Sequence, residues 1–128
     1  MAKERILVVD DEKDIVEIIR ELLEAEGYKT LAAYDGQEAL DQLQRHRVDG
    51  IVLDIKMPVL DGIGVIERVR AEAAIKDLPV VVLTATQVIR EAQEQLKKLK
   101  VNAWLSKPFE PDELIAAVAK VLKRGLTL

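Results

Sequence analysis

The stretch Gly50-Ile51-Val52-Leu53-Asp54-Ile55-Lys56-Met57-Pro58 predicts both a buried strand and a candidate site at the end of that strand. Residues 51–53 are continuously apolar, which is typical of a strand that is buried on both faces of a parallel sheet. Asp54 comes where this strand ends, and Pro58 disfavours a helix immediately afterwards. The pattern therefore predicts a carboxylate held at the carboxyl end of a buried strand.

The composition narrows the class of protein. The chain has 128 residues, of which 49% are hydrophobic and 33% charged, as expected of one globular domain with one core. The net charge of −4 argues against a surface that binds nucleic acid, and the absence of cysteine excludes disulfides and thiolate chemistry. No apolar run approaches the roughly 20 residues that cross a bilayer. We therefore expect a cytoplasmic protein without a membrane partner.

Strand and helix patterns alternate along the chain, which is the signature of a parallel α/β fold. We expect strands over residues 6–9, 29–33, 51–53, 79–83 and 103–106, with helices that begin near residues 14, 36, 62, 87 and 111. Five such units predict a three-layer doubly wound fold, in which helices cover both faces of a five-stranded parallel sheet of order 2-1-3-4-5. We expect residues 1–128 to form this one domain, with the second strand at an edge of the sheet.

The apolar spacing also predicts which side chains the first and last helices bury. In the first helix, expected over about 14–26, the apolar residues at helical spacing are Ile15, Ile18, Ile19, Leu22 and Leu23. Gly125 should end the last helix, which is expected to turn inward Leu114, Ile115, Val118 and Leu122.

Polar residues end four of the predicted strands. The carboxyl ends of parallel strands meet at one edge of the sheet, where folds of this class bind their ligands. The side chains expected to converge there are Asp10, Asp11, Asp54, Thr84 and Lys107. Three neighbouring carboxylates repel one another, and a hard cation such as Mg²⁺ relieves that repulsion by binding carboxylate oxygens. The sequence therefore predicts a magnesium site at this edge.

The same set of side chains suits phosphoryl transfer. An aspartate carboxylate such as that of Asp54 is a competent nucleophile toward a phosphoryl group. The transferring group spreads negative charge over three oxygens. A metal ion, the ammonium of Lys107 and the hydroxyl of Thr84 would together neutralise that charge.

Each of these residues has a simpler interpretation when it is taken alone. Asp10 and Asp11 could cap the first helix, and Thr84 could be an ordinary β-branched strand residue. Lys107 could be a solvated loop lysine. The functional interpretation depends on their joint convergence at one edge of the sheet.

Four blocks of sequence stand out in order over nearly the whole chain: Val8-Val9-Asp10-Asp11, Asp54 with Met57-Pro58 and Asp61-Gly62, Leu83-Thr84-Ala85, and Lys107-Pro108-Phe109. Together they resemble the receiver domain of two-component response regulators. The resemblance implies that Asp54 is the phosphoacceptor, which a histidine kinase or a histidine phosphotransfer protein phosphorylates.

The resemblance also assigns roles to the surrounding residues. It implies a Mg²⁺ ion held by Asp10, Asp11, Asp54 and the backbone carbonyl of Lys56. Thr84 and Lys107 would contact the phosphoryl oxygens. Lys56 and Thr86 occupy positions that tune the rate of dephosphorylation in such domains.

Two positions depart from the family's pattern. Trp104 stands three residues before Lys107, where the family usually has a Tyr or Phe that acts as a switch. Trp104 therefore has two interpretations, a packed aromatic or a switch residue. Lys100 stands where family members usually carry a Gly, a residue suited to a left-handed helix cap, so we expect the fourth helix to end differently here.

The resulting functional prediction is a signalling module, not an enzyme, which catalyses only its own phosphorylation and dephosphorylation. Phosphate on Asp54 would draw Thr84 inward and re-pack the surface formed by the fourth helix, the fifth strand and the fifth helix. That surface would bind an unidentified downstream target or a second copy of the chain. Two alternatives are a phosphate-independent interaction domain on the same fold and a Mg²⁺-dependent phosphohydrolase. The phosphohydrolase is disfavoured because Lys56 stands where such enzymes place a general acid.

Overall fold

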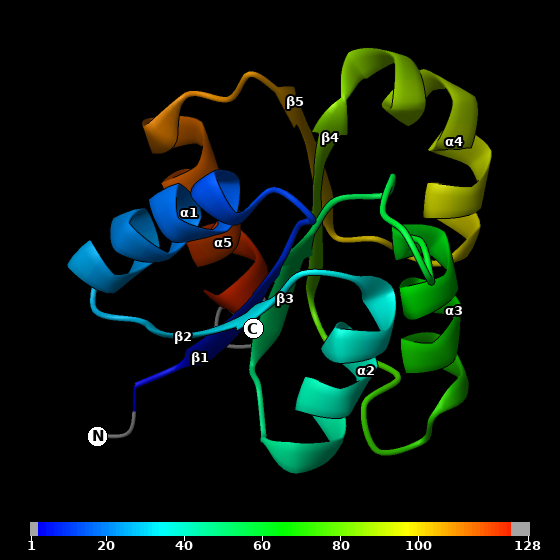
Figure 1. Cartoon of the computed structure of the whole chain (residues 1–128), viewed down its shortest axis with the longest axis horizontal. Coiled ribbons are helices and arrows are strands. Elements are labelled where there is room, and N and C mark those ends of the chain that lie inside the picture. Colours follow the sequence, from blue (N-terminus) through cyan, green and yellow to red (C-terminus); the bar gives the residue numbers. More distant parts are fainter. Residues whose placement is uncertain (1–2, 124–128) are drawn as a thin grey trace.

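A computed structural model describes residues 3–123, and it confirms the predicted fold. Five parallel strands form one sheet in the order β2-β1-β3-β4-β5, as Figure 1 shows. The strands are β1 (Arg5–Val9), β2 (Lys29–Ala33), β3 (Gly50–Leu53), β4 (Val80–Ala85) and β5 (Ala103–Lys107). The helices are α1 (Lys13–Ala25), α2 (Gly36–Arg45), α3 (Gly62–Ala71), α4 (Thr86–Lys98) and α5 (Pro111–Lys123).

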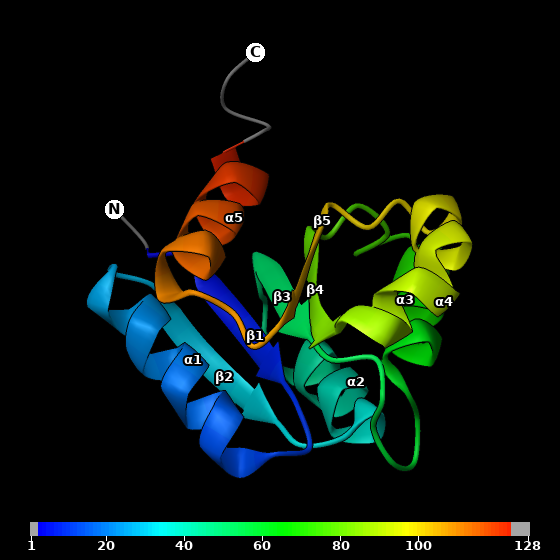
Figure 2. The same cartoon turned by 90° about the horizontal axis from the view of Figure 1, so that it is seen from above.

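The helices cover the two faces of the sheet unequally. α1 and α5 lie on one face, and α2, α3 and α4 lie on the other (Figure 2). Because successive strand residues point to opposite faces, β1 sends Leu7 and Val9 into the core under α2–α4 and Ile6 and Val8 into the core under α1 and α5. The sheet therefore separates two apolar cores, as a three-layer fold requires.

β3 lies at the centre of the sheet, and every residue of it is buried. Ile51 is aligned with Leu7 of β1 on one side and with Val80 of β4 on the other. This position between two strands explains the continuously apolar pattern from which the strand was predicted. β2 is an edge strand, as expected.

Ile18 corrects the prediction for the first helix. It was expected inside, but it is 49% exposed, and the buried residues of α1 are Val16, Ile19 and Leu23. These three recur at spacings of three and four residues and form one stripe. Ile18 was expected among the buried residues because it is apolar, but on the helix surface it lies beside the buried stripe. The predicted stop at Gly125 lies outside the described residues.

The end of α4 corrects a second expectation. The helix ends at Lys98, and the amides of Lys100 and Val101 donate to the carbonyls of Lys97 and Leu96, both at 3.0 Å. Lys100 has a φ of 56°, so it adopts the left-handed conformation that glycine normally supplies in this type of cap. The fourth helix thus ends in the usual way, with a lysine in the strained position.

Arg70 reinforces this helix end from α3. Its guanidinium donates to the carbonyls of Leu99 at 2.8 Å and Lys100 at 3.2 Å, and also to those of Lys76 at 2.9 Å and Leu78 at 2.7 Å. Burial lowers the pKa of Arg70, partly opposed by the charge of Asp77. A cation at these carbonyls complements the negative end of the α4 dipole. Arg70 therefore joins the C-terminal end of α4 to the loop between α3 and β4.

Within the part of the chain that the structure describes, no helix has the length and apolar character needed to cross a membrane.

We predict that Lys100→Gly stabilises the protein by about 0.5–1 kcal/mol. Glycine removes the strain of the left-handed conformation, which outweighs the extra backbone freedom that glycine gains in the unfolded chain. Urea unfolding followed by circular dichroism measures the change. Lys98→Gly is the matched control, because it replaces a helical residue of the same type, and it should cost about 0.5–1 kcal/mol. A loss of stability in both variants would contradict this account of the cap.

Candidate functional site

The pairing of β1 with β3 brings the acidic residues together. Val9 is aligned with Leu53, so Asp10 and Asp54 follow at neighbouring strand ends. The amide of Asp54 donates to the carbonyl of Val9 at 3.1 Å, which continues the parallel pairing by one further bond. Asp11 follows on the loop that leads to α1. Two segments far apart in the sequence therefore place three carboxylates at one point of the sheet edge.

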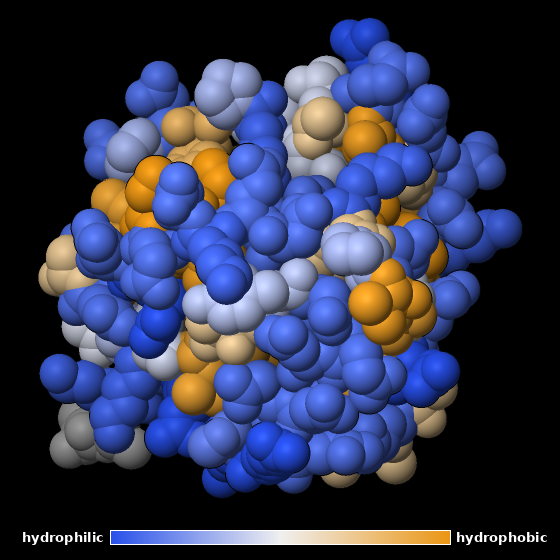
Figure 3. Space-filling view, viewed as in Figure 1, coloured by the Kyte–Doolittle hydropathy of each residue, from blue (hydrophilic) through white to orange (hydrophobic). Residues whose placement is uncertain are grey.

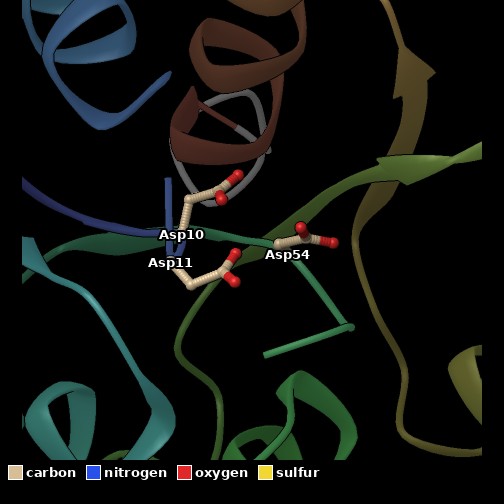
Figure 4. Close-up of side chains that lie close together, drawn as sticks. All are labelled: Asp10, Asp11 and Asp54. Carbon is tan, nitrogen blue, oxygen red and sulfur yellow. The ribbon is translucent and has the colours of Figure 1, made fainter. Parts of the chain in front are cut away.

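The three carboxylates form a compact acidic cluster (Figure 4). Ligand oxygens of Asp10, Asp11 and Asp54 all lie within 4.8 Å of one another. Asp10 and Asp54 are only 2% and 7% exposed, whereas Asp11 is open to solvent. Buried carboxylates at this separation need positive charge nearby.

Lys107, at the end of β5, supplies one positive charge. Its Nζ lies 2.6 Å from Asp10 Oδ2 and 3.0 Å from Asp54 Oδ2. Burial by itself lowers the pKa of Lys107, but its hydrogen bonds and ion pairs with both aspartates outweigh this, so the pKa is raised overall. Burial raises the pKa of Asp10, although the bond from Lys107 and the amide of Glu12 oppose this. The shift of Asp10 therefore follows from its burial, and that of Lys107 from its two carboxylate partners.

The cluster remains acidic after this pairing. Three carboxylates and one ammonium leave a formal charge of −2, from three negative charges and one positive charge. The donors are all carboxylate oxygens, the ligands that hard divalent cations such as Mg²⁺ take. The residues present therefore fit a divalent cation of this kind.

Backbone groups orient Asp54. Its Oδ1 accepts from the amide of Ile55 at 2.7 Å and from that of Lys56 at 3.4 Å, while its Oδ2 faces Lys107. The amide of Gly62 donates to the carbonyl of Ile55 at 2.8 Å, which closes the loop after β3. A methyl group on Gly62 would lie 2.3 Å from the carbonyl oxygen of Asp54, so no larger residue is compatible with this loop. From the sequence, Asp61-Gly62 was expected only to start a helix and to form part of a family motif, so this close approach was not predicted.

The other predicted site residues lie in β4, in β5, at the start of α4 and on the loop after Asp54. Thr84 is 1% exposed in β4, and within residues 3–123 no side-chain hydrogen bond joins its hydroxyl to the acidic cluster or to Lys107. Thr86 is the exposed first residue of α4, and Lys56 is exposed on the loop after Asp54. Trp104 is half-buried and packs against the core on the α4 side of the sheet. The roles assigned to these four residues stay predictions.

The capping interpretation of Asp10 is wrong. α1 begins at Lys13, and its N-cap residue is Glu12. Asp10 Oδ1 accepts from the amide of Glu12 at 3.0 Å, ahead of the helix, and its other oxygen binds Lys107. Asp10 thus belongs to the cluster, not to a helix cap.

An apolar groove of about 480 Å³ adjoins the cluster. It runs between α1 and the start of α5, where Figure 3 shows hydrophobic side chains at the surface. The lining residues are Ile15, Ile18, Lys107, Pro108, Phe109 and Pro111. Lys107 therefore contacts both the acidic cluster and this groove, and the exposed Ile18 lies in its wall.

Comparisons with known proteins agree on one family. The family model for the response regulator receiver domain matches residues 6–119. The chain is 41% identical over 120 residues to the response regulator MprA of Mycobacterium avium, which covers 94% of this chain and 51% of that protein. It is 40% identical over 126 residues to the probable transcriptional regulator ycf27 of Porphyridium aerugineum, which covers 97% of this chain and 50% of that protein. The chain thus spans about half the length of the curated relatives it matches.

Solved structures give the same result. A response regulator from Chloroflexus aurantiacus superposes with a TM-score of 0.89 at 34% identity, over 96% of this chain and all (100%) of the other. The chemotaxis response regulator CheY4 of Vibrio cholerae superposes with a TM-score of 0.87 at 32% identity, over 94% of this chain and 99% of the other.

We predict that Lys107→Ala destabilises the metal-free protein at neutral pH by about 2 kcal/mol, because it leaves two buried carboxylates without their cation. The loss should shrink as the pH falls, since burial raises the pKa of Asp10 and protonation of Asp10 removes one of the unpaired charges. Mg²⁺ should stabilise the variant more than the parent, because the ammonium no longer competes for the same oxygens. Urea unfolding with EDTA or with MgCl₂ measures both effects. Lys120→Ala, on an exposed position of α5, is the control. Equal stabilisation of the variant and the parent by Mg²⁺ would contradict this competition.

Proposed function

The chain belongs to the family of response regulator receiver domains, and from this premise we propose that Asp54 accepts a phosphoryl group. The family is a signalling module of two-component systems. The observation that carries the proposal is the arrangement around Asp54, whose oxygens face two backbone amides and Lys107 beside two further carboxylates. The donor in this proposal is a histidine kinase or a histidine phosphotransfer protein.

The proposed reaction is a displacement at phosphorus. A carboxylate oxygen of Asp54 forms a P–O bond while the P–N bond of a phosphohistidine breaks, and the leaving imidazole takes up a proton. The amides of Ile55 and Lys56 orient the nucleophile. Lys107 would exchange its contact with Asp54 for a phosphoryl oxygen, which keeps the ammonium paired with negative charge throughout. Mg²⁺ bound by Asp10, Asp11, Asp54 and the carbonyl of Lys56 would supply the remaining positive charge.

We propose that the phosphate is read out through Thr84 and α4. Ala85 alone separates Thr84 from α4, and as the N-cap residue it offers no side-chain bond to the helix. A hydroxyl drawn toward phosphate would therefore act on a helix start that has no side-chain cap. In this proposal the α4, β5 and α5 surface, with Trp104 in β5, then binds a downstream target protein or a second copy of the chain. The domain would catalyse only the gain and loss of its own phosphate.

We also propose that the phosphate donor docks on the groove defined by Ile15, Ile18, Lys107, Pro108, Phe109 and Pro111. A donor must bring its phosphorus to Asp54, and Lys107 lies at both sites. Ile18 is unusual for its exposure, and an apolar partner surface would cover it. The exposed acidic residues Asp14 and Glu17 directly precede the groove residues Ile15 and Ile18 in the sequence of α1. They would favour a donor with basic residues beside its apolar contact.

We predict that incubation with MgCl₂ and acetyl phosphate adds the mass of one phosphoryl group to the parent protein. The added mass should disappear on standing, because an acyl phosphate hydrolyses. Asp54→Asn, measured beside it by intact mass, should gain nothing. A parent protein that gains no mass from acetyl phosphate or from any of a panel of phosphorylated kinases would overturn the proposed function.

We predict that Ile18→Ser slows phosphotransfer from a phosphorylated histidine kinase by about tenfold, the size of effect expected for a buried interface residue. Its rate with acetyl phosphate should not change, because that donor needs no docking surface. Gel-based transfer of labelled phosphate measures the first rate, and intact mass measures the second. Equal slowing with both donors would show that Ile18 acts through the site itself and would exclude the groove as a docking surface.

A further inference from the structure

Gly36, the first residue of α2, lies directly against the loop that follows Asp54. A methyl group on Gly36 would lie 2.1 Å from the carbonyl oxygen of Leu60 and 2.8 Å from both its carbonyl carbon and its Cβ. Two of these atoms belong to the backbone, so a side-chain rotation cannot relieve the overlap. Any other residue at this position requires either α2 or the loop to move.

The start of α2 is held firmly. Asp35 Oδ1 accepts from the amide of Glu38 at 2.8 Å, and Glu38 Oε1 accepts from the amide of Tyr34 at 2.9 Å. These reciprocal bonds resemble a capping box, which fixes the first turn of a helix. Ala39, in the next turn, is fully buried. A larger residue at Gly36 would therefore displace the loop more readily than the helix.

The loop itself is short, closed and strained. Its internal bonds join Leu60 to Pro58 and Gly62 to Ile55, each at 2.8 Å. Val59 has a φ of 70°, an uncommon conformation for a β-branched residue, and is 80% exposed. Its own side chain has little packing to hold that conformation, so the contacts of the neighbouring residues must do so. Gly36 against Leu60 and Gly62 against Asp54 provide such contacts.

We propose that Gly36 is a positioning residue for the phosphorylation site, acting through Leu60 on the loop of residues 55–61. This inference rests on the proposed function, because that loop carries the Lys56 carbonyl assigned to Mg²⁺ and the amides that orient Asp54. The second helix contributes no side chain to the cluster. It determines how far the loop can approach the core, and hence where the loop's carbonyl and amides lie.

The decisive experiment separates positioning from stability. Amide NMR spectra of isotope-labelled protein, titrated with MgCl₂, give the Mg²⁺ affinity and report residues 55–61 directly. We expect Gly36→Ala to weaken Mg²⁺ binding by about tenfold, as substitutions of groups that support metal ligands do. Raised MgCl₂ should restore its phosphorylation by acetyl phosphate. Gln37→Gly is the matched control, because it weakens the same helix turn at an exposed position and adds nothing near Leu60.

Val59→Gly is a second test variant, for use if Gly36→Ala does not fold. It releases the strain of the loop and leaves the core unchanged. The free energy of unfolding should therefore stay the same or increase, while the affinity for Mg²⁺ falls several-fold. Mg²⁺ affinity that is unchanged in both folded variants, or that falls equally in Gln37→Gly, would overturn the positioning role. A parent protein that binds no Mg²⁺ would instead contradict the proposed function. The two failures are therefore distinguishable.

Discussion

The electrostatic demand of the acidic cluster governs the structure around it. Asp10 and Asp54 are buried at neighbouring strand ends with Asp11 beside them. The repulsion between these carboxylates must be offset if Asp10 and Asp54 are to stay buried. The ammonium of Lys107, 2.6 Å from Asp10 and 3.0 Å from Asp54, offsets part of it. The remaining negative charge fits a divalent cation and keeps Lys107 paired with the cluster. The same charge balance therefore affects folding as well as the proposed metal binding and phosphoryl transfer.

The strand order makes this arrangement unavoidable. In the order β2-β1-β3-β4-β5 the chain reverses direction across the sheet between β1 and β3, so the loops after these two strands lead to opposite faces. The two acidic strand ends lie side by side between these loops. Lys107 reaches them from the far edge strand because its side chain is long. The helices on each face bury the strands and keep the three strand ends in register.

Much of this could be predicted from the sequence, because the relevant patterns are local. The apolar run before Asp54, the alternation of elements and the polar residues at the ends of four strands indicated the sheet order and the acidic cluster. The features that were wrongly predicted or not predicted depend instead on contacts that a local sequence pattern does not show. Ile18 is apolar but lies beside the buried stripe of α1, and composition does not reveal which side of a stripe a residue occupies. Lys100 adopts a left-handed conformation because the surrounding bonds impose it against the residue's own preference. The contact of Gly36 with Leu60 joins two separate βα units, and the sequence of neither unit indicates this contact by itself.

The bonds of Arg70 have a mechanical consequence for α4. They hold the carbonyls of Leu99 and Lys100 at the end of the helix remote from the acidic cluster, while the near end begins at an N-cap without a side-chain bond. The helix has 13 residues, which at 1.5 Å per residue makes a rod of about 20 Å. Ala92 and Leu96 pack the middle of this rod on the core of the sheet. A rotation of α4 would therefore displace most the end that starts beside Thr84, because Arg70 holds the opposite end.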